Sequence, residues 1–146
     1  IAPEDEIREM PVATSFGPVE LTAVSMGNPH GVIFFDDIDS VDVHRLGREL
    51  ETHAMWPDRA NIEMAQKIDG HTVRMRVWER GSGETFACGT GSCATVAALV
   101  LRGVCPRNVP VDVHLLGGTL SITITADDNI LMTGPAKTAF VGCVEV

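Results

Sequence analysis

Apolar and polar residues alternate along much of the chain, a pattern typical of strands with one buried face. Together with short apolar runs bounded by turn residues, it predicts strands over 19–26, 31–35, 61–67, 71–79, 111–116, 120–125, 130–133 and 140–146. Asp69-Gly70 and Gly117-Gly118 each separate two of these runs, and such dipeptides favour tight hairpins. We therefore expect a protein dominated by strands.

Two segments have the spacing of helices instead. Over residues 42–53, Val43, Leu46 and Leu50 recur three and four residues apart, which predicts an amphipathic surface helix. The charged residues of this helix are expected to face water: Arg45, Arg48, Glu49 and Glu51. Residues 92–101 are apolar on nearly every side, which is typical of a buried helix.

The predicted fold class is α+β, with a strongly curved, mostly antiparallel sheet wrapped around one buried central helix and a second helix on the surface. The chain has 146 residues, of which 45% are hydrophobic, enough for one domain with its own core. Residues 1–18 are polar, acidic and proline-bearing, and we interpret them as an interdomain connector with a first extended segment. Residues 19–146 are interpreted as the domain itself.

Charge and apolar runs argue against several classes of partner. The formal net charge of −9 argues against nucleic acid and against an anionic membrane surface. The largely apolar run 94–101 is far shorter than the roughly 20 residues that span a bilayer. Residues 1–10 are acidic, unlike a signal peptide, and no methionine begins the chain, which we interpret as a fragment or a processed chain.

The four cysteines are sparse and irregularly spaced, which favours reduced thiols in the cytoplasm over a disulfide framework. No C-x-x-C and no paired-histidine spacing indicates zinc, so no metal site is expected. Cys93, Cys105 and Cys143 lie in no motif that would make a thiol reactive, and we interpret them as structural. The setting of Cys88 is different.

Cys88 lies in a loop of small residues immediately before the buried helix. A helix N-terminus offers unpaired backbone N–H groups and a partial positive charge, so a thiol there can have its pKa lowered from about 8.5 to roughly 3.5–7.5. The amides of Gly89, Thr90 and Gly91 are placed to bind an anion such as a carboxylate. The sequence therefore predicts a site for chemistry on a small acid, and a buried structural thiol is the competing interpretation.

Glu79 and His30 each allow two interpretations. Period two places Glu79 on the apolar face of its strand, where a carboxylate needs a partner; alternatively the strand ends at Trp78 and Glu79 is solvated. His30 is either a satisfied loop histidine or a site residue. Asn28, before a proline, is held out of the helical region, which suits a fixed side chain.

Residues 89–94 formally match the dinucleotide fingerprint G-x-G-x-x-G/A, and Asp112 lies near the acidic position expected downstream. That motif needs a buried strand directly before it and a crossover to a parallel strand. Residues 79–87 form a polar, glycine-bearing loop instead, and the flanking strands are expected to pair as hairpins. A dinucleotide-binding module is therefore a lesser alternative.

Several segments, in order from Val19 to Pro135, resemble the diaminopimelate epimerase family. They are residues 25–30 (SMGNPH), 51–53 (ETH), 57–63 (PDRANIE), 75–81 (MRVWERG), 83–91 (GETFACGTG) and 114–118 (HLLGG). Proline racemases and phenazine-biosynthesis isomerases, which share the fold, have the cysteine or helix region but not this whole set.

The resemblance implies an epimerase that needs no cofactor and interconverts LL- and meso-diaminopimelate in lysine and peptidoglycan precursor biosynthesis. In that family two cysteines face Cα from opposite sides; one removes the α-proton as thiolate and the other delivers a proton as thiol. Cys88 matches one of them, and Glu79 and His30 match residues that assist the cysteines. The residues that match substrate-binding positions are Asn28, Asn61, Glu79, Arg80, Gly89 and Thr90.

The family's other cysteine belongs to a first domain that has no counterpart in this sequence. The resemblance thus implies that residues 19–146 are the C-terminal epimerase domain, with diaminopimelate and the missing N-terminal domain as partners; a homodimer is considered for the full-length enzyme. We expect the isolated chain to fold, to be inactive, and to expose an apolar cleft face that the missing domain covers. The alternative is a non-catalytic domain that binds small carboxylates or a partner.

Overall fold

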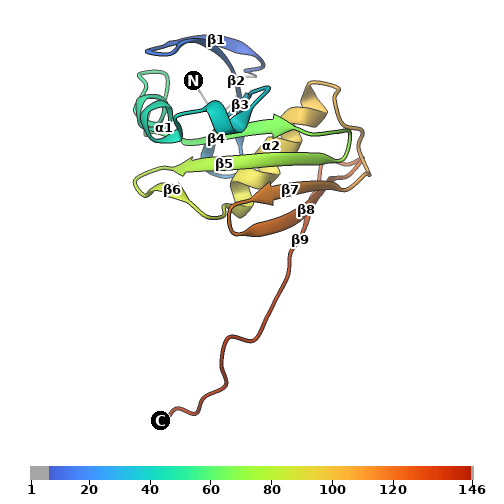
Figure 1. Cartoon of the computed structure of the whole chain (residues 1–146). Coiled ribbons are helices and arrows are strands. Elements are labelled where there is room, and N and C mark those ends of the chain that lie inside the picture. The colour runs from blue at the N-terminus through green and yellow to red at the C-terminus, as the bar shows by residue number, and fades with distance from the viewer. Residues whose placement is uncertain (1–6, 146) are drawn as a thin grey trace.

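The computed structural model describes residues 7–145 of the chain (Figure 1). The helices are α1 (Val43–Glu51) and α2 (Gly89–Leu101), with a single 3-10 turn at Ile38–Ser40. The strands are β1 (Met10–Thr14), β2 (Gly17–Ser25), β3 (Pro29–Phe34), β4 (Asn61–Lys67), β5 (Thr72–Glu79), β6 (Gly83–Thr85), β7 (Val111–Leu115), β8 (Gly118–Ile124) and β9 (Ile130–Thr133).

These strands form one sheet in the order β1-β2-β3-β4-β5-β7-β8-β9, with β6 paired to β5 off this path. The β3–β4 and β5–β7 pairs are parallel and the other pairs are antiparallel. Parallel neighbours need a crossover connection, and α1 and α2 lie in the two crossovers. The predicted α+β class with a mostly antiparallel sheet is confirmed.

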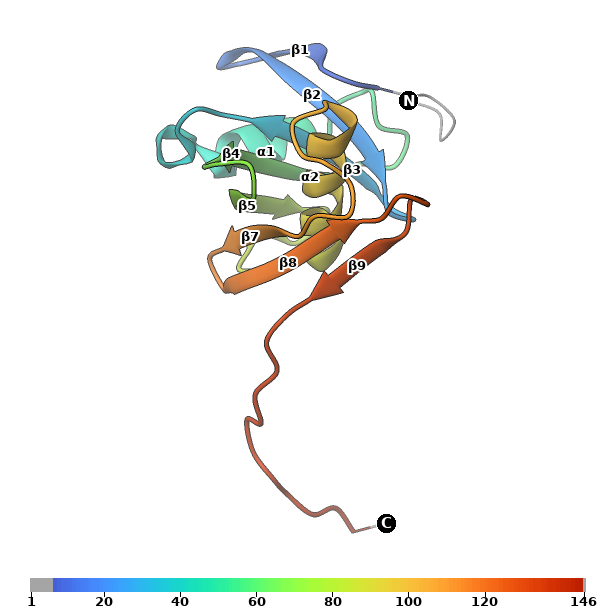
Figure 2. The ribbon, with the colours of Figure 1, turned by 90° about the vertical axis from the view of Figure 1, so that its right-hand side faces the viewer.

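The two helices cover opposite faces of the sheet. Helix α2 contacts β2, β3, β4, β8 and β9, and Figure 2 shows it enclosed by the curve of the sheet. Helix α1 packs on the outer face, against β1, β4, β5 and β6. The central strands are therefore covered on both sides, and most of their side chains are buried, on both faces of the sheet.

Strand β4 shows the effect of this double coverage. Its first five residues, 61–65, are all buried. Ile62 and Met64 pack in the cluster beneath α1, whereas Ala65 packs in the cluster beneath α2. Because side chains alternate along a strand, Asn61 and Glu63 share the face of Ala65. Two polar side chains are thus buried beneath the central helix.

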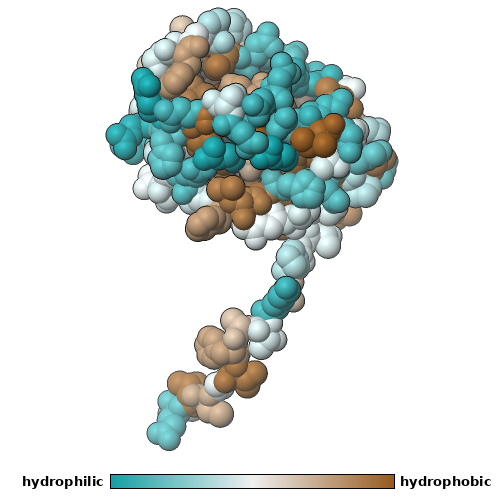
Figure 3. Space-filling view, in the orientation of Figure 1, coloured by the Kyte–Doolittle hydropathy of each residue, from teal (hydrophilic) through white to brown (hydrophobic). Residues whose placement is uncertain are grey.

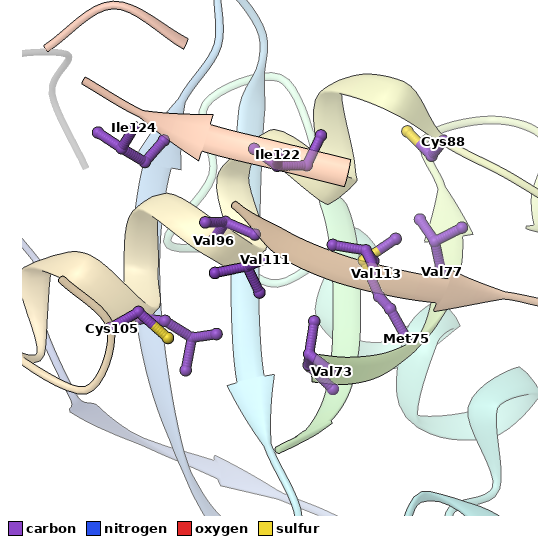
Figure 4. Packing of buried hydrophobic residues seen from close by; sticks show 12 residues of the cluster. Val73, Met75, Val77, Cys88, Val96, Cys105, Val111, Val113, Ile122 and Ile124 are labelled. Carbon is purple, nitrogen blue, oxygen red and sulfur yellow. The ribbon is translucent and has the colours of Figure 1, made fainter. Parts of the chain in front are cut away.

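The core beneath α2 follows the predicted period of β5. Val73, Met75 and Val77 point toward the helix and join Val96 in one apolar cluster (Figure 4). Cys88 lies at the margin of the same cluster. Burying each such side chain contributes about 1.5–3 kcal/mol, so the start of α2 is held by the main core.

Helix α2 begins at Gly89, earlier than the predicted start at residue 92. The prediction relied on apolar residues, whereas the first turn consists of small residues that the Cys88 cap holds in the helix. The strands that flank α2 form the predicted hairpins, β5 with β4 and β7 with β8. In addition β5 and β7 pair with each other in parallel, which the sequence did not predict. The crossover that a dinucleotide fingerprint requires is therefore present, but the element before the helix is the three-residue strand β6, which is not buried.

The predicted strand 140–146 was wrong for the residues that the structure describes. Residues 134–145 have no regular structure and run away from the body (Figure 1), and Phe140 is 85% exposed. Its apolar residues have no neighbouring strand here to pair with. Val146 lies outside the described residues.

The predicted connector contains more structure than expected. Residues 1–6 lie outside the described part, but Met10–Thr14 form β1, the edge strand next to β2. Val12 is buried in the cluster beneath α1, so this first extended segment packs as part of the sheet.

All four cysteines are free. Cys105 is buried and Cys93 partly buried, but Cys143 is exposed in the tail, so its interpretation as structural was wrong. Among residues 7–145, no helix is both long and apolar enough to cross a bilayer. Over the same range, no group of three or more His, Cys, Asp or Glu side chains is placed to hold a metal ion.

Candidate functional site

Cys88 is the N-cap residue of α2, with extended backbone (φ −141°, ψ 111°). Its sulfur accepts a hydrogen bond from the Gly91 N–H at 3.3 Å and lies 3.6 Å from Thr90 Oγ1. The residue is 8% exposed. The predicted position, a sulfur at the N-terminus of the central helix, is therefore found.

The expected lowering of the Cys88 pKa is not found. Burial raises the pKa of the Cys88 thiol above its ordinary value, and the hydrogen bonds from Thr90 and Gly91 offset only part of this effect. The negative charges of Glu79 and Glu63, when ionised, raise this pKa further. Cys88 is therefore a thiol at neutral pH in this chain. The sequence revealed the helix terminus but not the two carboxyl groups beside it.

Glu79 is the last residue of β5, so the strand does not end at Trp78. Thr85 Oγ1 donates a hydrogen bond to Glu79 Oε1 at 2.5 Å, across the β5–β6 turn. The carboxylate is half-buried and acts on the pKa of Cys88 by its charge. Of the two interpretations, the partnered carboxylate at the end of the apolar face is confirmed.

His30 is fully buried, in β3 rather than in a loop. Its Nδ1 lies 2.7 Å from Glu63 Oε1, and its Nε2 lies 3.1 Å from Asn28 Oδ1. A line of three polar side chains thus runs from the interior, at Glu63, to the β2–β3 loop, at Asn28. The prediction that the Asn28 side chain is fixed is confirmed.

Glu63 is the residue that the sequence analysis missed. It is 0% exposed, and its second oxygen, Oε2, has no hydrogen-bond partner among the described residues. A side chain added at Gly91 would come within 2.7 Å of Glu63 Oε1 and 3.2 Å of Cys88 Sγ, so the carboxyl lies directly beneath the first turn of α2. A charged residue inside an otherwise buried strand was the signal that could have found it.

Asn61 joins two loops that border the site. Its Nδ2 donates to the Pro29 carbonyl at 3.2 Å, and its Oδ1 accepts from the Arg80 N–H at 2.9 Å. The guanidinium of Arg80 is held outward by Asp58, through both its carbonyl and its carboxylate. Of the predicted binding residues, Asn61 is therefore buried in a supporting role and Arg80 reaches the surface.

Glu51 supports the same region from the opposite face of the sheet. It was expected to face water but is buried, 6% exposed, and accepts hydrogen bonds from Trp78 Nε1 at 2.7 Å and from the Gly81 N–H at 2.9 Å. Burial by itself raises the pKa of this carboxyl, but these bonds and the nearby Arg59 lower it overall. Glu51 thus anchors the turn after β5 as a carboxylate. The helical period predicted that Glu51 faces solvent. That prediction was wrong because α1 is covered on two sides, by the sheet and by this turn.

The amides of Gly89 and Thr90 lie in the first turn of α2, where no carbonyl of the helix can accept from them. A side chain at Gly89 would meet Met132 Sδ at 3.2 Å, so glycine lets β9 approach this end of the helix. The two amides therefore remain a candidate cradle for an anion, as predicted.

Exposed apolar side chains surround this end of the helix. Phe86 is 75% exposed, Leu116 57% and Met132 55%. We call these three residues the apolar rim; the Phe86 carbonyl bonds the Gly117 N–H at 2.7 Å, which joins two parts of it. Figure 3 shows brown atoms at the lower edge of the body, where β6 leads into α2 and β7 turns into β8. The predicted exposed apolar face is therefore present.

The structure gathers the predicted residues at one end of the sheet. His30 and Asn61 are register partners where β3 and β4 begin, and Glu79 ends the antiparallel neighbour β5. The helix α2 starts above them at Cys88. One ionisable sulfur, two carboxyl groups, a histidine and free helix amides thus share one region, which suits proton transfer on a small anion.

Solved structures with a similar fold define the class. A hydroxyproline epimerase from Agrobacterium vitis aligns with a TM-score of 0.66 over 82% of this chain and 41% of that chain, at 15% identity. A probable proline racemase from Agrobacterium radiobacter aligns with a TM-score of 0.63 over 82% of this chain and 42% of that chain, at 13% identity. The fold is therefore that of the racemase and epimerase group.

The sequence relatives narrow this class to one family. The diaminopimelate epimerase family profile matches residues 22–139. A diaminopimelate epimerase of Bacillus cereus strain ATCC 10987 is 51% identical over 124 residues, and one of Bacillus anthracis strain CDC 684 is 50% identical over 124 residues. The chain belongs to the diaminopimelate epimerase family. The match covers 85% of this chain but only 43% of each relative, so the chain spans less than half of their length.

Proposed function

We propose that this chain supplies one half of the active site of a cytoplasmic diaminopimelate epimerase, which interconverts the LL and meso forms for lysine and peptidoglycan precursor synthesis without a cofactor. The observation that carries the proposal is the Cys88 sulfur at the N-terminus of α2, flanked by Glu79 and by the buried line from Glu63 to Asn28. The four free cysteines agree with a reducing compartment.

In the proposed reaction, the Cα–H bond breaks and its electron pair spreads from Cα onto the α-carboxylate. The proton goes to a thiolate on one face, and a thiol on the other face gives its proton to Cα. The amides of Gly89 and Thr90 stabilise the negative charge that develops on the carboxylate, as preorganised donors at helix ends do. Asn28, Glu79 and Arg80 are the proposed contacts to the rest of the substrate, and Asn61 takes part by holding the segments of Asn28 and Arg80 through its own hydrogen bonds.

The raised pKa of Cys88 supports a role as the proton donor in the resting state, because it favours the thiol form at neutral pH. In this proposal the thiolate that starts the reaction is the cysteine of the missing domain. After one turnover Cys88 is deprotonated and serves as the base in the reverse direction. We propose that the half-buried Glu79 and the buried His30 influence the transfer of the proton to and from the Cys88 sulfur.

The second half of the site is the proposed partner. The chain spans 43% of its relatives, and the apolar rim lies open beside Cys88. An exposed apolar patch next to a reactive group is typical of an interface. We propose that the missing domain covers this rim and places its cysteine opposite Cys88.

The test is exchange of the α-proton of diaminopimelate in deuterated water. The chain is assayed alone and with the separately produced first domain of a Bacillus relative. Exchange only in the mixture, reduced below detection by Cys88→Ala, is the expected result. Exchange by the chain alone, or exchange that survives Cys88→Ala in the mixture, would contradict the proposal.

A second candidate is a domain that binds small carboxylates without catalysis. It is favoured by the protonated Cys88 beside free helix amides, because such a site can hold an anion without removing a proton. Calorimetry with diaminopimelate, combined with absence of exchange in the verified mixture of both halves, would select this candidate instead.

A further inference from the structure

The buried line Glu63–His30–Asn28 lies near Cys88, and its hydrogen bonds also indicate where the protons of Glu63 and His30 lie. Its three members come from β4, β3 and the loop before β3, and only Asn28 is partly accessible. The contacts are 2.7 Å from Glu63 Oε1 to His30 Nδ1 and 3.1 Å from His30 Nε2 to Asn28 Oδ1. Each of these two hydrogen bonds contains one proton. The chemistry of Asn28 at one end of the line and of Glu63 at the other decides which atom carries each proton.

Asn28 Oδ1 can only accept, so His30 Nε2 must carry a proton. A neutral imidazole has one N–H, and its Nδ1 is then an acceptor. The donor in the contact with His30 Nδ1 must in that case be Glu63, protonated at Oε1. The alternative is an imidazolium paired with a carboxylate, and the surroundings of Glu63 decide between the two.

Those surroundings disfavour a carboxylate. Glu63 is fully buried, Oε2 has no partner among the described residues, and His30 is the side chain that bonds Oε1. A buried ionised carboxylate with one oxygen unpaired costs far more than a neutral carboxyl, whose unpaired atom is only a carbonyl oxygen. The titratable groups nearby are His30 from β3, Glu79 from β5 and Cys88 at the start of α2, and a charge on Glu79 repels a second negative charge. Burial accordingly raises the pKa of Glu63.

We propose that Glu63 is a positioning residue: its protonated carboxyl donates to His30 Nδ1 and thereby fixes the His30 tautomer that holds Asn28 by its oxygen. Asn28 Nδ2, which bonds to none of the described residues, is then turned toward the site as a donor. This inference rests on the proposed function, because Asn28 is a proposed substrate contact. Glu63 sets the direction of that contact from a distance.

Glycine at position 91 fits this assignment. An added Cβ would lie 2.7 Å from Glu63 Oε1, the same oxygen that bonds His30. The absence of a side chain lets the carboxyl lie under the helix without being pushed off His30. Gly91 also donates its N–H to Cys88 Sγ, so the positioning residue and the reactive sulfur both lie against one glycine.

The test uses the full chain and needs neither substrate nor the missing domain. Long-range proton–nitrogen correlation spectra of the nitrogen-15-labelled chain report which ring nitrogen of His30 is protonated, and His30→Gln assigns the signals. At neutral pH we expect Nε2 protonated and Nδ1 unprotonated. Glu63→Gln, whose amide N–H can still donate to Nδ1, is expected to keep this tautomer, and Glu63→Leu to lose it.

A second measurement follows unfolding against pH. If Glu63 is protonated in the folded chain, wild type loses stability as pH rises above 4.5, the ordinary pKa of the group, because the unfolded state then releases a proton that the folded state keeps. Glu63→Gln lacks this loss, so its free energy of unfolding relative to wild type increases with pH. This comparison remains informative even if Glu63→Leu fails to fold.

Two results would overturn the assignment. One is an imidazolium, or a proton on Nδ1 instead of Nε2, at neutral pH in wild type. The other is a stability difference between Glu63→Gln and wild type that stays constant or decreases as pH rises, as an ion pair with His30 would give. Neither result depends on epimerase activity. The assignment of the protons on Glu63 and His30 and the proposed function can therefore fail separately, although the role of Asn28 as a substrate contact falls with the proposed function.

Discussion

Two glutamates, Glu51 and Glu63, are buried on opposite faces of the same sheet and have opposite pKa shifts. Glu51, beneath α1, accepts from Trp78 Nε1 and the Gly81 N–H and lies near Arg59, and its pKa is lowered. Glu63, beneath α2, bonds the His30 ring through Oε1 and leaves Oε2 without a partner among the described residues, and burial raises its pKa. Both are less than a tenth exposed.

Burial raises the pKa of both carboxyl groups, and only at Glu51 do the donors and the nearby Arg59 outweigh it. The outer layer provides N–H groups from a turn and an indole, so a carboxylate is stable there and holds the turn after β5. The inner layer provides a helix N-terminus whose nearest amide, that of Gly91, already bonds Cys88. The carboxylate of Glu51 therefore has a structural part on the outer face, whereas the candidate site lies on the inner face.

The largest effect is expected from removing the outer carboxylate. Glu51→Leu leaves the buried Trp78 N–H without an acceptor, at about 1–3 kcal/mol, and removes the bond from the more exposed Gly81 N–H, at about 1 kcal/mol, so we expect a loss of about 3 kcal/mol in the free energy of unfolding. Urea denaturation measures it. Glu51→Gln, which keeps one acceptor oxygen, should lose about half as much.

The pH dependence of the same variant sharpens the comparison. Because the pKa of Glu51 is lowered in the folded chain, its contribution is present above the ordinary value of 4.5 and is lost as pH falls through the folded pKa. The gap between wild type and Glu51→Leu should therefore narrow in acid. A gap that stays the same down to acid unfolding would contradict the carboxylate role.

The second prediction compares one glycine from each helix. A Cβ at Gly47 of α1 would lie 2.5 Å from Trp78 Cβ, which cannot move, whereas one at Gly91 of α2 would meet the end of the Glu63 side chain at 2.7 Å. We expect Gly47→Ala to cost about 3 kcal/mol and Gly91→Ala about 1 kcal/mol, after the helix preference of alanine is included.

Denaturation curves again provide the measurement. Gly70→Ala is the matched control, because nothing lies within 4 Å of its added Cβ, and it should stay within about 0.5 kcal/mol of wild type. Equal losses for Gly47→Ala and Gly91→Ala would show that the inner layer is as rigid as the outer one.

The smallest effect concerns the thiol of Cys88. Because burial, and then the charge of Glu79, raises the pKa of Cys88, its alkylation should be slow at neutral pH and rise with pH. Glu79→Gln removes a nearby negative charge and should move this profile to lower pH. Peptide mass spectrometry separates Cys88 from Cys143, whose exposed thiol serves as internal reference. A profile that Glu79→Gln leaves in place would show that Glu79 does not act on the sulfur.

Much of the fold could be predicted because its strands are half-buried and keep period two. The strands 61–67 and 130–133 have the predicted bounds, and both predicted hairpins form. The parallel pairs could not be predicted, because strand pairing across a crossover leaves no local pattern. The last segment keeps its apolar residues but has no neighbouring strand among the described residues.

The candidate site divides in the same way. Cys88 could be predicted from its small neighbours and the helix after it, and Glu79 from the period of β5. Glu63 and Glu51 were missed because their burial comes from elements distant in sequence, α2 above one and the β5–β6 turn beside the other. The pKa of Cys88 depends on its burial and on the charges of Glu79 and Glu63, which neighbouring positions in the sequence do not reveal.

The single amide of Asn61 has a consequence for motion. It bonds the Pro29 carbonyl on one side and the Arg80 N–H on the other, so the loop that carries Asn28 and the turn that carries Arg80 are tied through one side chain. Displacement of either segment strains the same two hydrogen bonds. We therefore expect the two segments to move together, so that a molecule that orders one of them also orders the other.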